Sequence, residues 1–195
     1  MIIAIGGLIA VGKSTAAARL AQRLGFRCIS AGAVFRDLAQ QRGMTLEEFG
    51  RLAERDHSVD RDLDRLQAEM AATGNAVVES RLCGWVVNAH LKVWLRAPVE
   101  VRAGRLALRE GTTLEVAMQK LIERETSERT RYRTIYGIDL DDLAPYHVIL
   151  DTDLWLPGPI TDTLAHLART MRDRGPRAEA IPGQPVQQPL PDLHG

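Results

Sequence analysis

The sequence is poor in cysteine and lysine and has no long apolar run, and each scarcity excludes a class of protein. Its 195 residues include two cysteines, Cys28 and Cys83, and no CxxC or Cys/His spacing. This argues against a disulfide framework or a structural zinc site. No uninterrupted apolar segment approaches the roughly 18 residues that a membrane helix needs. We therefore expect a cytoplasmic protein that does not contact a membrane.

The charges of the chain balance. Lysine plus arginine and aspartate plus glutamate each number 25, so no basic excess is available to hold a nucleic acid. Lys13, Lys92 and Lys120 are the only lysines, and the remaining basic residues are arginines, whose forked guanidinium suits bidentate contacts with a ligand. Biased nucleotide composition explains most of these arginines equally well. The length and the 45% apolar fraction fit one α/β domain with a substantial core.

Short apolar runs alternate with longer helical patterns along the chain. This alternation is typical of repeated βα units. It predicts a three-layer α/β fold in which helices cover both faces of a five-stranded parallel sheet. The expected strands are residues 2–5, 26–29, 76–78, 91–95 and 147–150.

Helix boundaries are marked by capping residues and glycines. Thr45 and Glu48 have the spacing of a capping box and predict a helix through about Arg55. The other expected helices are residues 13–24, 60–72, 98–110 and 113–133, the last as one helix or two. Five of the nine prolines lie after residue 174. We therefore expect residues 1–173 to form the domain and 174–195 a disordered, proline-rich tail.

Residues 7–15, with the sequence GLIAVGKST, match the phosphate-loop pattern G-x-x-x-x-G-K-[ST] and lie between the first strand and the first helix. Backbone N–H groups of such a turn face a nucleoside triphosphate, a lysine bridges its phosphates and a hydroxyl ligates Mg²⁺. Ala10 cannot adopt positive φ as easily as glycine. The expected triphosphate-binding residues are Gly7, Ala10, Val11, Gly12, Lys13, Ser14 and Thr15, with Ser14 also on the metal.

Two arginines follow the ends of expected strands. Arg36 lies one turn into the helix after the second strand, behind Ser30 and Gly32, and Arg81 follows Glu79 at the end of the third strand. Ligands of open parallel sheets bind at these carboxyl ends, so both arginines can reach one crevice. For either arginine alone, a solvated surface position is the alternative.

A third arginine-bearing segment covers residues 123–133. In a helix, Arg124, Glu128 and Arg131 share one face and form a clamp of two guanidiniums with an orienting carboxylate. Glu125 and Arg129 then pair on another face, where a solvent-exposed i, i+4 ion pair accounts for them.

Together these segments resemble the archaeal-type cytidylate kinases of the nucleoside monophosphate kinase family, over nearly all of residues 1–155. Besides the phosphate loop, the resemblance is carried by residues 30–36 (SAGAVFR), 43–50 (GMTLEEFG), 60–65 (DRDLDR), 91–98 (LKVWLRAP) and 128–139 (ERTRYRTIYGID). It implies a P-loop NTPase fold with a helical monophosphate-binding insertion at about residues 31–74 and a mobile lid at about 110–137. It also implies that ATP phosphorylates CMP or dCMP, giving ADP and CDP or dCDP.

The resemblance implies roles for individual residues. The acceptor-binding positions it matches are Ser30, Gly32, Arg36 and Arg81. The positions that close on both phosphates are Arg124, Glu128 and Arg131, and Arg105 resembles the arginine near the ATP base. We expect catalysis to depend on Lys13, Arg124 and Arg131.

Three acidic residues complete the candidate site. Glu79 is a candidate to orient metal-bound water, with a helix or loop contact as its alternative. Together with Arg61 and Arg65, Asp60 and Asp64 can read a cytosine edge, because a base needs both donors and acceptors. Salt bridges on the helix surface, to Arg61 and Arg65, explain them equally well.

The leading hypothesis is a kinase for CMP or dCMP whose partners are small nucleotides, and which is a monomer or a weak dimer. A second is a P-loop kinase for another nucleotide or metabolite, which the residues Ala10, Val11 and Ser80 permit, since the family usually has glycine at the last position and a loop richer in glycine. A third is a nucleotide-binding regulatory protein without turnover, with the tail as a docking segment.

Overall fold

Five parallel strands form the centre of the molecule. The computed structural model describes residues 1–173, and the tail expected at 174–195 lies outside this range. The strands are β1 (Ile2–Gly7), β2 (Arg27–Ser30), β3 (Ala76–Glu79), β4 (Leu91–Arg96) and β5 (Val148–Asp151). Their order in the sheet is β2-β3-β1-β4-β5, and every neighbouring pair is parallel. All five expected strands are confirmed, each to within two residues at either end.

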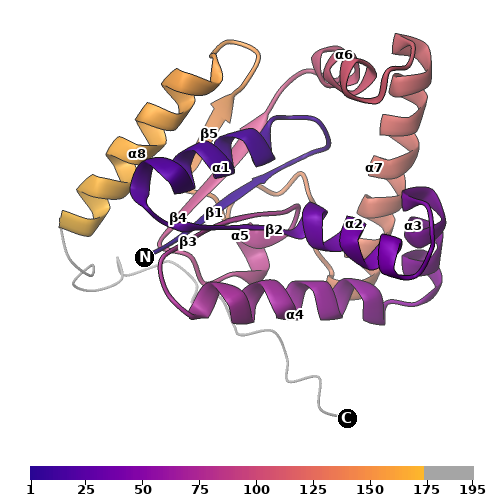
Figure 1. The fold of residues 1–195 in the computed structure, drawn as a ribbon, viewed down its shortest axis with the longest axis horizontal. Coiled ribbons are helices and arrows are strands. Elements are labelled where there is room, and N and C mark those ends of the chain that lie inside the picture. Colours follow the sequence, from indigo (N-terminus) through magenta and orange to yellow (C-terminus); the bar gives the residue numbers. More distant parts are fainter. Residues whose placement is uncertain (174–195) are drawn as a thin grey trace.

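Helices cover both faces and extend past one edge of the sheet (Figure 1). Their bounds are α1 (Lys13–Leu24), α2 (Ala31–Gln41), α3 (Leu46–Arg55), α4 (Ser58–Ala72), α5 (Cys83–Val86), α6 (Val99–Glu110), α7 (Leu114–Tyr136) and α8 (Pro157–Asp173). The capping box at Thr45 and Glu48 is present, and residues 114–133 belong to one continuous helix whose N-cap is Thr113. Within residues 1–173 no helix is long and apolar enough to cross a bilayer.

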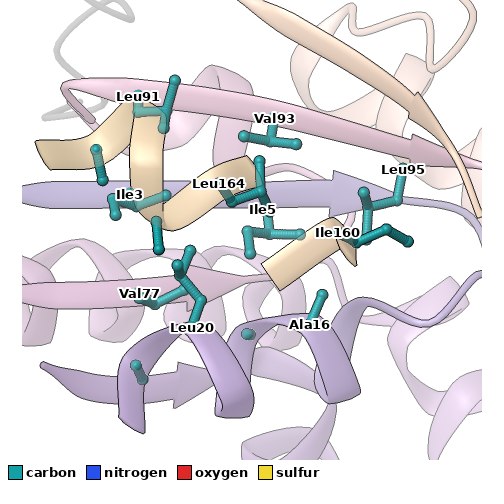
Figure 2. Close-up of a cluster of buried hydrophobic side chains, with 14 of the residues drawn as sticks. Ile3, Ile5, Ala16, Leu20, Val77, Leu91, Val93, Leu95, Ile160 and Leu164 are labelled. Carbon is teal, nitrogen blue, oxygen red and sulfur yellow. The ribbon is translucent and has the colours of Figure 1, made fainter. Parts of the chain in front are cut away.

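The main core lies between the sheet and the helix pair α1 and α8. Ile3 and Ile5 of β1 point toward Leu20 of α1 and Leu164 of α8, and all four are inaccessible to solvent (Figure 2). Ala4, between the two isoleucines, packs on the opposite face with Val78 and Val87. This alternation follows from the period of two in a strand, and it places small side chains on the face that α4 and α5 cover.

The remaining helices lie beyond the carboxyl ends of the strands. Figure 1 shows α2, α3, α6 and α7 grouped there, with α7 crossing close to α3 and α4. A separate core of Ile9, Leu106, Ala117 and Leu121 packs α6 and α7 against the loop after β1. The sheet therefore presents its carboxyl edge to a space bounded by helices from distant parts of the sequence.

Candidate active site

The phosphate loop joins β1 directly to α1. Gly12 has a φ of 101° and immediately precedes the first residue of the helix. Ala10 has a φ of 58°, and within residues 1–173 it is the only non-glycine residue with positive φ. A left-handed conformation costs an alanine about 1 kcal/mol relative to glycine, so the loop keeps the phosphate-loop turn at some expense in stability. Ala10 therefore adopts the positive φ that we expected to be unfavourable for alanine.

Lys13 lies inside this loop. Its Nζ donates to the carbonyl oxygen of Leu8 at 2.6 Å, and the side chain is 5% exposed. Burial, together with the positive charge of Arg81, lowers the pKa of Lys13 to about 7. An anion beside the ammonium has the opposite effect, so a bound phosphate would restore the charge of this lysine.

Three oxygen-bearing side chains meet where β2 and β3 end. Ser14 Oγ donates to Glu79 Oε1 at 2.9 Å, and the Ser30 hydroxyl donates to the same carboxylate. Ser30 also caps α2, since its Oγ accepts from the Ala33 N–H at 3.1 Å. β2 pairs with β3 so that Ser30 lies opposite Glu79. Register between neighbouring parallel strands thus brings Ser30 to Glu79, and Ser14, the other expected metal-site residue, reaches the same carboxylate from the first turn of α1.

A buried carboxylate organises the arginines opposite the loop. Glu128 of α7 accepts from Arg81 Nε at 2.9 Å, and the two side chains are 14% and 18% exposed. Burial alone would raise the pKa of Glu128, but Arg81 and Arg124 outweigh it and hold the pKa below its usual range. Arg124, Glu128 and Arg131 border the same cavity, which confirms the shared helix face.

Asp60 and Asp64 of α4 reach α7 rather than surface arginines. Arg131 Nε donates to Asp60 Oδ2 at 2.8 Å inside the protein, and Tyr136 Oη donates to Asp64 Oδ2 at 2.7 Å. Burial raises the pKa of both carboxyls, that of Asp64 to about 7. Of the two interpretations left open for Asp60 and Asp64, helix-surface salt bridging is wrong. Arg65 instead pairs with its exposed helix neighbours.

The predicted pairing of Glu125 with Arg129 is also wrong. Glu125 is 9% exposed, accepts from the Ile9 N–H at 3.2 Å and forms an ion pair with Arg102 of α6. Arg129 pairs with Asp141 at 2.7 Å. Because α6 packs along α7, the face of α7 that bears Glu125 is covered, and this carboxylate ties α7 to the phosphate loop.

These groups surround one cavity of about 1100 Å³. Ligand pockets typically measure about 300 to 1000 Å³, so the space exceeds that of one small ligand. The phosphate loop, Arg81 and residues of α2, α4 and α7 all contribute to its lining. Every predicted site residue borders the cavity except Gly7 and Ser30. Gly7 lies beneath it, where an added Cβ would come within 2.5 Å of the Leu95 carbonyl oxygen.

Several residues that border the cavity were not predicted. The first is Thr152, which holds the expected residue Arg105 in place. Arg105 donates to Thr152 Oγ1 at 2.8 Å and to the Thr152 carbonyl oxygen at 2.6 Å, and this joins the end of β5 to the site. Thr152 directly follows β5, so the tendency of ligands to bind at the carboxyl ends of parallel strands could have identified it. Gln67 lies three residues after Asp64 and so on the same helix face. No sequence signal marks Trp155, which is 57% exposed at the rim.

Transfer of a phosphoryl group, as opposed to mere nucleotide binding, requires cations on the far side of the phosphate loop as well as within it. This cavity provides both sets of cations, and its phosphate loop follows the carboxyl end of a strand in a parallel sheet. The chain is accordingly a P-loop kinase. A gluconokinase from Sinorhizobium meliloti 1021 shares the fold, with a TM-score of 0.56 at 18% identity over 88% of this chain and 94% of that chain.

Sequence comparison narrows the class. The model of the cytidylate kinase-like family matches residues 2–154. The cytidylate kinase of Pyrococcus furiosus is 49% identical over 158 residues, 80% of this chain and 82% of that protein. The cytidylate kinase of Pyrococcus abyssi is 48% identical over 158 residues, 80% and 87% of the two chains. The chain belongs to the cytidylate kinase-like family, which confirms the resemblance inferred from its motifs.

Proposed function

We propose that the protein transfers the γ-phosphoryl group of ATP to CMP or dCMP, giving ADP and CDP or dCDP. The observation that carries this proposal is the single large cavity in which the phosphate loop faces Arg81, Arg124 and Arg131. Two phosphate-bearing ligands bound end to end need that distribution of positive charge. The names of the related proteins support a cytidine nucleotide as the acceptor.

Catalysis rests on alignment and charge neutralisation. The acceptor phosphate is already anionic at neutral pH, so no general base has to remove a proton from it. Lys13 and the arginines of α7 stabilise charge on the transferred group, while Arg36 and Arg81 hold the acceptor phosphate in line. Arg36 is exposed on α2 and borders the cavity, so it is free to turn toward a ligand.

The residues present fit a magnesium ion. Ser14 and Glu79 offer a hydroxyl and a carboxylate oxygen within hydrogen-bond distance of each other, and Mg²⁺ prefers such oxygen ligands. Residues 1–173 contain no cluster of three or more metal-binding His, Cys, Asp or Glu side chains. That suits Mg²⁺, which usually takes only one or two protein oxygens and completes its shell with water and substrate phosphates. When bound, the ion neutralises phosphate charge.

Residues 110–137 act as a lid and residues 31–74 as the acceptor-binding insertion in this proposal. α7 carries Arg124 and Arg131 and contacts α4 through two side-chain pairs, so movement of one helix alters the position of the other. Closure over both nucleotides would exclude water and prevent hydrolysis of ATP.

A coupled ADP-release assay tests the proposal. The full chain is supplied with ATP, Mg²⁺ and, in turn, CMP, dCMP, UMP, AMP and GMP. Release that depends on CMP or dCMP is the expected result. Release only with a different acceptor would replace the cytidine nucleotide in the proposal, and no release with any acceptor would overturn the kinase activity.

A further inference from the structure

One buried polar side chain in the cavity wall has no role in the reaction steps described above. Gln67 of α4 is 1% exposed and borders the cavity, and its Oε1 is shielded from solvent without a hydrogen-bond partner. Leaving a buried acceptor unsatisfied is costly, and such groups are rare in folded proteins. An unsatisfied oxygen at a ligand cavity points to a donor that the ligand brings.

The orientation of this amide is fixed by its neighbour. Gln67 Nε2 donates a long hydrogen bond, 3.4 Å, to Asp64 Oδ1. The other oxygen of the Asp64 carboxylate accepts from Tyr136 Oη. Rotating the amide by 180° would place Oε1 against the Asp64 carboxylate, where two acceptors repel. Above its pKa of about 7, the ionised Asp64 therefore keeps the amide nitrogen on its own side and leaves the oxygen for another partner.

The surroundings of Gln67 suit a nucleobase. Leu63, one turn earlier on the same face of α4, and Phe35 of α2 border the same cavity and provide apolar contact area. Small-ligand pockets combine such apolar walls with a few polar groups that read the ligand edge. Of the phosphate-binding arginines, Arg81 follows β3, Arg124 and Arg131 lie on α7, and Arg36 lies on α2. None of them lies on α4, so the wall that Gln67 and Leu63 form is available to the other end of an acceptor nucleotide.

We propose that Gln67 is a specificity-determining residue whose amide oxygen accepts a hydrogen bond from the exocyclic amino group of the acceptor base. Asp64 and Tyr136 act as positioning residues for that amide. The inference rests on the proposed function, because it assigns the base end of the same acceptor site. Cytosine offers an amino donor at the position where uracil has a carbonyl oxygen, so the Gln67 oxygen favours the first base and repels the second.

The discriminating variant is Gln67→Leu, which keeps the approximate shape and removes both polar atoms. We expect the KM for CMP to rise about 10-fold or more with kcat within about threefold, and the preference for CMP over UMP in kcat/KM to fall about 10-fold or more. Thermal stability should stay the same or rise, since an unsatisfied acceptor is removed. Loss of selectivity without loss of stability is not what a purely structural residue produces.

A second variant and a control complete the experiment. Asp64→Asn allows the Gln67 amide to turn, because an asparagine side chain can donate to Oε1, and it should relax the CMP preference while UMP turnover rises. Gln40→Leu makes the same chemical change at an exposed position of α2 and should leave the CMP-to-UMP ratio unchanged.

A ratio within about twofold of wild type in folded Gln67→Leu protein, with wild type active on CMP, would overturn this inference and leave the proposed function standing. Calorimetric titration of CMP and UMP into the same variants gives a readout that does not need turnover. Equal loss of affinity for both bases in Gln67→Leu would also overturn the assignment. Failure of wild type to phosphorylate or bind any nucleoside monophosphate would instead remove the proposed function first.

Discussion

The two ends of the cavity are built in different ways. At the phosphate loop the contacts are local, and Lys13 reaches the carbonyl oxygen of Leu8 only five residues away. At the opposite end, Arg131 meets Asp60 across 71 residues of sequence, and that pair exists only because α7 passes within side-chain reach of α4. Backbone geometry therefore sets the binding of the triphosphate, whereas the acceptor end depends on how two helices are placed relative to each other.

The same difference separates the energetic consequences of substitution. At the loop, the buried ammonium of Lys13 is hydrogen-bonded to a backbone carbonyl, and Glu79 and Glu128 act on it without a direct ion pair, so its removal breaks no salt bridge. At the acceptor end, Arg131 and Asp60 form one buried ion pair, and Arg81 and Glu128 form another. We expect substitutions at the loop to affect activity alone and substitutions on α4 or α7 to affect activity and stability together.

The largest effect is expected for Lys13→Ala. Removing the cation that faces the phosphates should lower kcat about 1000-fold or more, as measured by ADP release. Chemical denaturation should show no loss in the free energy of unfolding, because the variant also removes the cost of burying an ammonium group. Lys120→Ala, at an exposed lysine of α7, is the matched control. Retained turnover in Lys13→Ala would remove its catalytic role.

A smaller effect on turnover and a larger one on stability are expected for Arg131→Ala. It should lower kcat about 100-fold and, by leaving Asp60 buried without its partner, lower the free energy of unfolding by about 3 kcal/mol. Arg129→Ala removes an exposed ion pair on the same helix and should cost less than about 1 kcal/mol.

The double variant Arg131→Ala with Asp60→Asn separates the two contributions. Replacing the carboxylate by an amide removes the unpaired charge, so stability should largely return while turnover stays low. If Arg131→Ala destabilises the protein no more than Arg129→Ala does, the two ends of the cavity do not differ in the way described.

The sequence was sufficient for the fold and for the loop end of the site. Strand periodicity and the G-x-x-x-x-G-K-[ST] pattern are local signals, and for that reason the strands and the loop could be predicted. The contact of Ser30 with Glu79 was not predicted, because it depends on the register between β2 and β3. The spacing of Arg124, Glu128 and Arg131 was equally readable, because helical geometry fixes it.

The hydrogen-bond and ion-pair partners of the site's buried side chains could not be predicted from the sequence. Arg102 as the partner of Glu125 and Tyr136 as the partner of Asp64 depend on how α6, α7 and α4 pack, and intervals of 23 and 72 residues carry no periodic signal. The i, i+4 rule predicted a surface pair for Glu125 because it considers one helix in isolation. Where a second helix covers that face, tertiary contacts replace the local pair.

The smallest effect, and the sharpest test of the comparison, is the dependence of stability on pH. Burial raises the pKa of Asp64 to about 7, so between pH 4 and 7 the folded state holds a proton that the unfolded chain has released, and stability falls as the pH rises. The pKa of Lys13 is lowered to about 7, so above pH 7 the unfolded chain holds the extra proton and stability rises.

The two ends of the cavity therefore act in opposite directions and place a minimum near pH 7 in the ligand-free protein, about 2 kcal/mol below the stability at pH 5 or pH 9. Denaturant titrations at pH 5, 7 and 9 measure it. Relative to wild type, Asp64→Asn should flatten the acid side alone and Lys13→Ala the alkaline side alone, so each variant identifies one end. ATP should abolish the alkaline rise, because phosphate keeps Lys13 protonated when folded. A wild-type curve whose alkaline side is unchanged by Lys13→Ala would mean that the lysine is solvated and that the loop does not bury its charge.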